Sequence, residues 1–348
     1  MDNLLASGSR LPNEVELARV FGVGHVTLRS ALGKLEAEGL IERIRSKGTF
    51  VTSRSNRVTF LMILPDGMEN LDTPSRYIVA GIEAYAEQLG VTVEHCPASL
   101  FLSFSQKQRQ EIKKLHHVRG IIFETGHRRA DIALIKALQE MELPVVIPHG
   151  LTSDRERSGF LVQRSDEKKA FSESFRYLAD RGHRRIAGLF LDILDEEPGL
   201  IRGFTMAELR EFLRTNGLDD SEDLIALIPN EHERMEQVVK SWMTRRERPS
   251  AIICQSDRIA IRIYSMVQES GLRIPEDISI IGYSNYPGGQ LVLPPLTTTD
   301  TLLRLCAQSA LDKLLDSASW YIPGEVPPEL ITPCRFIQRS SVIDRRSE

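Results

Sequence analysis

Three side chains near residue 25 have the types and the spacing to read the edges of DNA bases. His25, Thr27 and Arg29 supply an imidazole, a hydroxyl and a guanidinium along one short stretch. A helix across this stretch would turn them largely away from the apolar positions Leu28 and Leu32. An α-helix fits the DNA major groove, and side chains near its N-terminus reach base edges first. We therefore expect these three residues to contact bases.

Two short helices and a hairpin are expected to position these side chains. Asn13 followed by Glu16 is a capping-box start for one helix, and Gly22 and Gly24 mark a tight turn before the next. The positions expected to face the core are Val15, Leu17, Ala18 and Phe21, then Val26, Leu28, Ala31, Leu32 and Leu35. Residues 40–51 alternate as a β-hairpin with a basic tip. This order of elements predicts a winged helix–turn–helix.

Charge is unevenly distributed along the chain. Residues 1–54 hold eight Lys and Arg against six Asp and Glu, a net of +2, whereas the whole chain carries −4, which leaves −6 for the rest. A basic head on an acidic body suits a protein that places one small domain on phosphates. A winged helix can also be a protein-interaction module, and apolar periodicity alone does not separate the two functions.

Residues 10–51 resemble the DNA-binding domain of the GntR family of bacterial repressors. The resemblance rests on LPNEVELA, TLRSAL, LEAEGLIER and KGTFV, which occur together at the family's spacing. It implies that the hairpin wing holds phosphates or enters the minor groove. The wing residues that it implies are Arg45, Lys47, Gly48 and Thr49. The chain departs from the family at Val15, often an arginine, at Gly24 and His25, usually serine and arginine, and at Ser46, usually glycine.

The composition is ordinary for a soluble globular protein. Hydrophobic residues make up 41% and charged residues 26% of 348 residues, which suggests two or three domains. No apolar run approaches the roughly 20 residues that span a bilayer, and no signal-peptide pattern begins the chain. The four cysteines include no CxxC pair, which argues against a zinc site or a disulfide framework. We expect a cytoplasmic protein with no membrane partner.

Motifs of common enzymes are absent from the sequence. There is no GxGxxG after the first strand of the body, no phosphate-binding GxxxxGK loop, no GxSxG and no HExxH. We therefore expect no catalytic residue, no metal, no cofactor and no enzymatic activity.

From residue 57 the pattern changes to alternating strands and helices. Short apolar runs such as VTFLMILP, GIIFE and SAIICQ are typical of buried strands in parallel sheets. The runs form two consecutive groups, which predicts an α/β body of two lobes with a ligand cleft at the carboxyl ends of the strands. The expected domains are a winged head at 1–52, a polar linker at 53–56 and a two-lobed effector domain at 57–348.

The body resembles the effector domain of the LacI/GalR family, which has the periplasmic-binding-protein-like (type I) fold. The resemblance rests on LADRGHRRIAGL, RPSAIICQSDRIAI, GLRIPEDISIIGYSN and LPPLTTTD, in family order. A GntR-type head on a LacI-type body is the architecture of arabinose-type repressors. The resemblance implies a repressor that binds a double-stranded DNA operator as a homodimer. It also implies that a small-molecule effector between the lobes controls operator affinity.

Polar residues at the ends of the expected strands are the candidates for the effector site. They are Asp66, Thr125, His149, Arg164, Ser256, Ser284 and Asp300. A guanidinium fork matches carboxylates and phosphates, so Arg164 is the expected anchor for an anionic group. Asp66 and Asp257 could equally cap the helices that follow them, and His149 could be an ordinary loop residue.

Several sugar-binding groups of LacI relatives are replaced in this chain. The arginine expected three residues before Gly203 is Leu200, and Arg202 beside the glycine is expected to point elsewhere. Ser256 and Ser284 stand where relatives have asparagine and aspartate. Because buried sugar hydroxyls need polar partners, the replacements indicate a sugar derivative or another ligand rather than a typical monosaccharide. The alternative is a ligand-sensing or protein-interaction module with a degenerate DNA-binding head.

Overall fold

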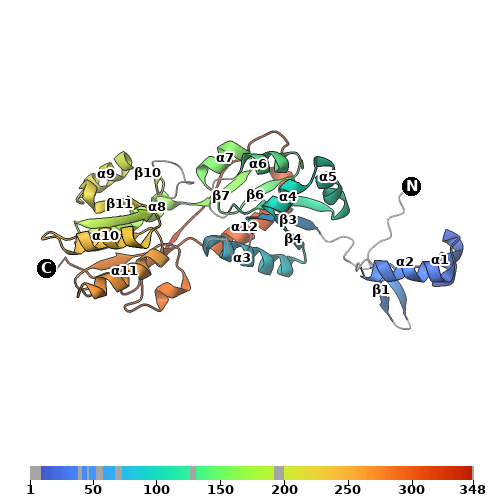
Figure 1. The fold of residues 1–348 in the computed structure, drawn as a ribbon, viewed down its shortest axis with the longest axis horizontal. Helices are drawn as coiled ribbons and strands as arrows, with labels where there is room; N and C mark the ends of the chain where they lie inside the picture. Colours follow the sequence, from blue (N-terminus) through green and yellow to red (C-terminus); the bar gives the residue numbers. More distant parts are fainter. Residues whose placement is uncertain are drawn as a thin grey trace.

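The chain forms a winged head and a two-lobed α/β body (Figure 1). The computed structural model describes residues 9–37, 41–44, 47–51, 58–66, 73–125, 131–191 and 200–346. No helix in these ranges is long and apolar enough to cross a membrane. The predicted fold class, a winged helix–turn–helix followed by two lobes on parallel sheets, is confirmed.

Helix α1 (Glu14–Phe21) begins and ends at the predicted residues. The Asn13 side chain accepts a hydrogen bond from the Glu16 N–H at 2.9 Å, and the Glu16 carboxylate accepts one from the Asn13 N–H at 3.1 Å. These two bonds satisfy N–H groups that have no partner within the helix. Gly22 ends the helix in the left-handed conformation at φ 62°, which costs glycine little.

Helix α2 (His25–Ala37) and the antiparallel strands β1 (Ile41–Ile44) and β2 (Gly48–Val51) complete the head. The hairpin prediction is thereby confirmed. The small core of the head contains the buried residues Ala18, Leu28, Leu32 and Ile41.

Several apolar positions assigned to this core from the sequence lie on the surface instead. Val15, Phe21 and Val26 are 65%, 66% and 84% exposed, and Ala31 is also exposed. A helix turns about 100° per residue, so only one narrow stripe of α2 can face the core. Leu28, Leu32 and Leu35 occupy that stripe. Val26 points about 160° away from Leu28. The assignment of these four residues to the core was wrong.

The first lobe of the body contains a six-stranded parallel sheet in the order β15-β7-β6-β5-β3-β4. Its strands are β3 (Thr59–Leu64), β4 (Thr92–Pro97), β5 (Val118–Phe123), β6 (Val145–Ile147), β7 (Leu161–Ser165) and β15 (Leu330–Thr332). Its helices are α3 (Thr73–Leu89), α4 (Ala98–Ser103), α5 (Gln106–Leu115), α6 (Ile132–Gln139), α7 (Thr152–Ser158) and α12 (Leu303–Leu315). Alternate residues of β3 point to opposite faces, so Phe60 and Met62 pack with α3 and α12, and Leu61 and Ile63 pack with α4 and α6.

The second lobe contains a four-stranded parallel sheet in the order β11-β8-β12-β13. Its strands are β8 (Ile186–Leu191), β11 (Ile225–Ile228), β12 (Ala251–Cys254) and β13 (Ser279–Ile281). Its helices are α8 (Glu167–Ala179), α9 (Met206–Thr215), α10 (His232–Met243) and α11 (Asp257–Glu269). Helices α10 and α11 cover one face and α8 and α9 the other, so β8, β12 and β13 are buried on both sides, as apolar runs predict, whereas the edge strand β11 leaves Leu227 exposed.

Smaller elements lie between the main strands and helices of the body. They are the hairpin of β9 (Leu200–Ile201) and β10 (Phe204–Thr205), the antiparallel pair β14 (Thr298–Asp300) and β16 (Arg335–Ile337), and the 3₁₀ helices η3 (Glu222–Leu224), η4 (Pro287–Gln290) and η5 (Ser317–Ser319). The chain passes between the lobes at residues 165–167, 300–303 and 332–335. After the second lobe it returns as α12 to pack beside α3 in the first (Figure 1). A change in the angle between the lobes would therefore act on these connecting segments.

Candidate functional site

The outer side of α2 carries the three residues predicted to contact bases. His25, Thr27 and Arg29 are all exposed. The Arg29 side chain is 72% exposed, yet its Nε donates a hydrogen bond to the Glu14 carboxylate at 2.9 Å. This bond lowers the pKa of Glu14 and raises the pKa of Arg29. The guanidinium expected to meet a base is thus already paired with a carboxylate at the start of α1.

The wing presents a basic edge that includes a residue not predicted from the sequence. Lys47 is exposed, Gly48 and Thr49 are half-buried, and Arg45 lies outside the described residues. Gly48 has a φ of 115°, and a Cβ there would lie 2.7 Å from the Arg10 Nε. Arg10 therefore lies directly against the wing. The next residue, Leu11, pairs with β2, because its backbone N–H donates a hydrogen bond to the Thr49 carbonyl at 2.8 Å.

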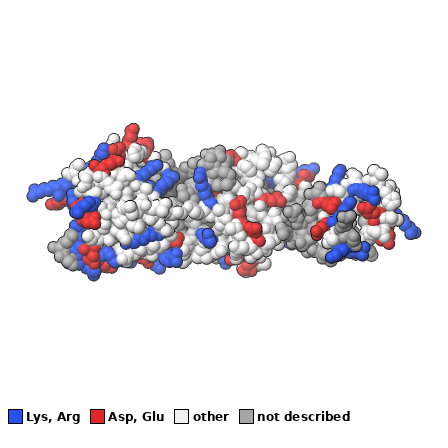
Figure 2. All heavy atoms as spheres, turned by 90° about the horizontal axis from the view of Figure 1, so that it is seen from below, with Lys and Arg blue, Asp and Glu red and all other residues white. Residues whose placement is uncertain are grey.

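Acidic residues partly neutralise the basic residues of the head. Arg43 of β1 lies 3.3 Å from the Glu36 carboxylate and 3.8 Å from the Glu14 carboxylate. On the face drawn in Figure 2, basic and acidic side chains of the head lie side by side. The described residues of the head are therefore not uniformly basic on that face, and individual side chains must determine how it meets DNA.

A cavity of about 190 Å³ lies between the lobes of the body. His149, which follows β6 of the first lobe, lines it together with Ser256 and Ser284, which follow β12 and β13 of the second. Three of the seven predicted effector-site residues thus meet at the carboxyl ends of parallel strands, where ligands of α/β proteins bind. The cavity is also lined by polar residues that sequence reasoning missed: Glu167, Asn230, Gln255, Arg258 and Thr301. Asn230 and Gln255 closely follow strands, a signal that could have identified them.

Arg202 lines the same cavity, and the expectation that it points elsewhere was wrong. It occupies the tight turn between β9 and β10 at φ 49°, followed by Gly203 at φ 78°. The hairpin reverses the chain at this turn and directs the Arg202 side chain, only 10% exposed, to the Glu167 carboxylate, to which Nη1 donates a hydrogen bond. The guanidinium also lies 5.7 Å from the Tyr283 ring centroid. A paired carboxylate and guanidinium therefore form one polar wall of the cavity.

Asp257 lies behind the cavity as the first residue of α11. Its carboxylate accepts hydrogen bonds from the Thr298 hydroxyl at 2.5 Å and from the Tyr286 N–H at 2.7 Å. Burial raises the pKa of Asp257 to about 7, although these bonds and Arg339 act in the opposite direction. A Cβ on Gly282 would collide with Asp257 Oδ1, so only glycine fits there. Asp257 thus connects α11 to β14 and to the cavity-lining loop, while the Ser256 side chain caps the helix by accepting from the Ile259 N–H.

The other predicted effector-site residues do not line this cavity. Arg164 binds the Glu329 carboxylate through two nitrogens, one of them Nη2 at 3.1 Å, so an anionic ligand would have to compete with Glu329. Asp66 is exposed and accepts a bond from the Ser99 N–H at 3.0 Å in the first turn of α4. Thr125 is buried beside Glu124.

Asp300 lines a separate cavity of about 440 Å³ between α3 and α12, which Ser284 also borders. Its carboxylate accepts hydrogen bonds from Asn285 and Arg335, each at 3.2 Å. These bonds tie β14 to β16 where the chain passes between the lobes. Among the described residues, no group of three or more His, Cys, Asp or Glu could hold a metal ion.

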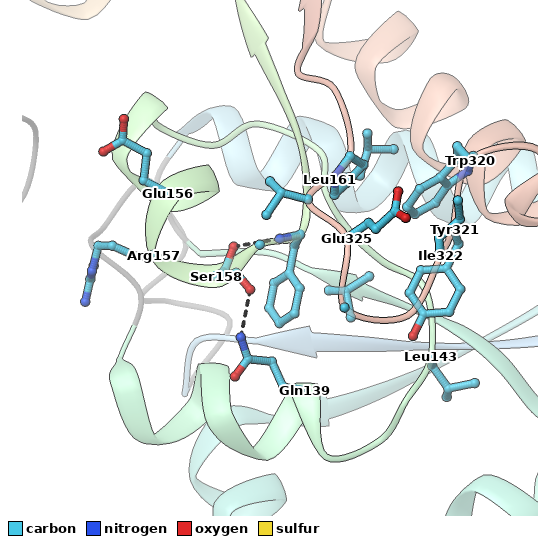
Figure 3. Close-up of a pocket in the computed structure, with 16 residues that line it drawn as sticks. Gln139, Leu143, Glu156, Arg157, Ser158, Leu161, Trp320, Tyr321, Ile322 and Glu325 are labelled. Carbon is cyan, nitrogen blue, oxygen red and sulfur yellow. Dashed lines mark hydrogen bonds between the residues drawn. The ribbon is translucent and has the colours of Figure 1, made fainter.

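Another cavity of about 440 Å³ lies in the first lobe, away from the cleft (Figure 3). Trp320 and Tyr321 line one side of it, and Gln139 donates a hydrogen bond to the Ser158 carbonyl at 2.9 Å on another. Leu143 and Phe160, which precede β6 and β7, also line it, so it lies at the amino ends of these strands. Volume alone therefore does not identify the effector site. Of the cavities described, the smaller one is where the carboxyl ends of parallel strands from both lobes meet.

Two family descriptions match the chain. Residues 1–51 match bacterial regulatory proteins of the gntR family, and residues 175–342 match the periplasmic binding protein-like domain. The arabinose metabolism transcriptional repressor of Geobacillus stearothermophilus is 26% identical over 344 residues, covering 88% of each chain. The HTH-type transcriptional repressor PurR of Vibrio cholerae serotype O1 is 29% identical over 253 residues, covering 69% of this chain and 68% of PurR.

Solved structures share the fold of the body. A LacI-family transcriptional regulator from Rhizobium etli aligns with a TM-score of 0.62 and 24% identity over 82% of this chain and 99% of its own. The lac repressor dimer bound to operator and the anti-inducer ONPF aligns with a TM-score of 0.63 and 18% identity over 83% of this chain and 95% of its own. The sequence relatives are regulators rather than enzymes, in agreement with the expectation that this chain has no enzymatic activity.

Proposed function

We propose that the chain is a DNA-binding transcriptional repressor that joins a GntR-type head to a LacI-type, periplasmic-binding-protein-like body, and that a small molecule in the interlobe cavity controls its affinity for operator DNA. The observation that carries this proposal is that His149 of the first lobe and Arg202 of the second line one cavity. A ligand that contacts both lobes binds one lobe arrangement better than another. It therefore shifts the population between arrangements, and linkage transmits the shift to DNA affinity.

The cavity favours a small, polar effector. Its volume of about 190 Å³ lies below the roughly 300–1,000 Å³ of pockets for drug-sized ligands. The Arg202–Glu167 pair offers both donors and acceptors, and Arg258 is exposed at the start of α11. We propose a sugar derivative rather than a typical monosaccharide, because the usual sugar-binding asparagine and aspartate are Ser256 and Ser284.

We propose that the protein acts as a cytoplasmic homodimer on a double-stranded operator. A twofold dimer presents two heads to paired half-sites, as the geometry of helix–turn–helix recognition requires. Leu291 and Leu293 of the second lobe are 81% and 79% exposed, and exposed apolar side chains of this kind fit a subunit interface. The proposed domain boundaries remain 1–52, 53–56 and 57–348; the linker lies outside the described residues.

A thermal-shift screen on the full chain tests the effector proposal. Pentoses, sugar phosphates, sugar acids and nucleobases are added separately, and a compound that binds the folded state raises Tm as its concentration increases. Each hit is then added to chain bound to DNA selected from a random duplex pool, and a changed Kd supports effector control. A complete absence of hits, or hits that leave Kd unchanged, would contradict it.

Salt dependence of DNA binding separates the proposal from its alternative. A head that contacts phosphates binds DNA with an affinity that falls steeply with salt concentration, because counterions are released. A ligand-sensing or protein-interaction module with a degenerate head would select no DNA sequence at any salt concentration. The full chain is measured against the selected duplex and against a scrambled duplex of equal length.

A further inference from the structure

Val26 is a large apolar side chain in an unexpected position. It is 84% exposed, the highest value among the exposed large hydrophobic side chains of the described residues. It also belongs to the first turn of α2, between His25 and Thr27, which are both predicted to contact bases. A side chain with no hydrogen-bonding group thus occupies the part of the helix that reaches base edges first.

Helix geometry places Val26 at the centre of the outward face of α2. Residues three, four and seven positions further on share a helix face, and here they are Arg29, Ser30 and Gly33. All three are exposed, and a Cβ on Gly33 would meet nothing within 4 Å. The buried Leu28 and Leu32 lie on the opposite side. The outward face therefore consists of one valine surrounded by polar and small residues.

We propose that Val26 is a specificity-determining residue that contacts the C5-methyl group of a thymine in the major groove. The thymine methyl is the apolar feature among the base-pair edges of that groove, and apolar side chains recognise it. Valine offers two methyl groups for such a contact and no donor or acceptor for other base edges. This inference rests on the proposed function, in which α2 enters the major groove.

Removing one methyl group from DNA tests the contact directly. The full chain first selects a preferred duplex from a random pool. Each thymine of that duplex is then replaced, one at a time, by deoxyuridine, which lacks the C5-methyl group and keeps the same base pairing. We expect one thymine per half-site at which the replacement weakens wild-type binding about fourfold, the effect of one buried methyl group.

The Val26→Ala variant should lose this sensitivity. Its Kd should be the same for the thymine and the deoxyuridine duplex, whereas Val26→Thr, which keeps one methyl group, should retain part of the difference. Val20→Ala is the matched control, because Val20 is a 75% exposed valine on α1, and it should keep the full fourfold effect. Circular dichroism melting verifies that the variants fold.

The outcomes separate this inference from the function on which it rests. If Val26→Ala keeps the full deoxyuridine effect, or if no thymine is sensitive in the wild type, Val26 does not read a methyl group and DNA reading by the head stands. If the selection enriches no sequence, the proposed DNA reading fails together with the role of Val26.

Discussion

Replacing Asp257 with asparagine should make the stability of the second lobe less sensitive to pH. The carboxyl group is buried, and it accepts bonds from the Thr298 hydroxyl at 2.5 Å and the Tyr286 N–H at 2.7 Å. An asparagine amide can accept from the Tyr286 N–H and donate to the Thr298 hydroxyl, so the substitution keeps both partners. It removes only the group that can ionise.

The size of the effect follows from the pKa of Asp257, which burial raises from 3.8 to about 7. Between these two values the folded chain holds a proton that the unfolded chain has lost. The folded state therefore binds more protons, and the free energy of unfolding falls as pH rises through this window. A pKa difference of about three units lowers the free energy of unfolding by about 4 kcal/mol once the pH is above 7. Asparagine does not ionise, so the variant avoids this loss of stability.

Trp242 offers a probe for this measurement because it is buried in the second lobe. In a Trp320→Phe background its fluorescence reports that lobe alone, since the chain has 2 tryptophans. Urea unfolding of this background with and without Asp257→Asn, at pH 4.5 and at pH 7.5, gives the difference in stability at each pH. The Asp257→Asn variant should gain about 3 kcal/mol relative to its parent over this range. A constant difference would refute the raised pKa, and a relative gain by the parent would show that its hydrogen bonds favour the ionised form.

Three further variants test the remaining proposals. Arg29→Ala should weaken specific DNA binding roughly 5- to 150-fold if the guanidinium makes a bidentate base contact, and an unchanged affinity ratio between the selected duplex and random DNA would contradict that contact. Arg202→Met should abolish the rise in Tm that an effector causes, because Arg202 lines the cavity, whereas Lys136→Met on α6 should preserve it. Leu291→Asp combined with Leu293→Asp should convert the dimer to a monomer in sedimentation experiments, because it places two charges in the proposed interface. Leu115→Asp, at a 75% exposed leucine of the first lobe, is the control that should remain dimeric.

Local patterns in the sequence predicted the elements well, because each depends on neighbouring residues. The capping box of Asn13 and Glu16 required only four consecutive residues, and it formed as expected. Strands such as β3, β8 and β12 were identified because burial on both faces requires a nearly unbroken run of apolar residues.

Site residues were harder to predict because tertiary neighbours decide what a side chain meets. Arg164 lies within β7 rather than after it, and Glu329, distant in the sequence, lies beside it just before β15 and binds its guanidinium. Glu167 and Arg202 come from separate elements whose approach depends on the β9–β10 hairpin. No spacing rule connects residues 35 positions apart in a fold whose turns are not known in advance.

The two clearest failures of local reasoning both occur where a ligand is proposed. Val26 fits the apolar pattern of α2 but is exposed, and Arg202 occupies a turn at positive φ, where an ordinary residue is strained. Each departs from a rule that favours stability: apolar side chains are buried, and left-handed turns use glycine. Natural sequences keep such departures mainly where function requires them. The exposed valine is accounted for by a methyl group in the major groove, and the strained arginine by a polar wall of the interlobe cavity.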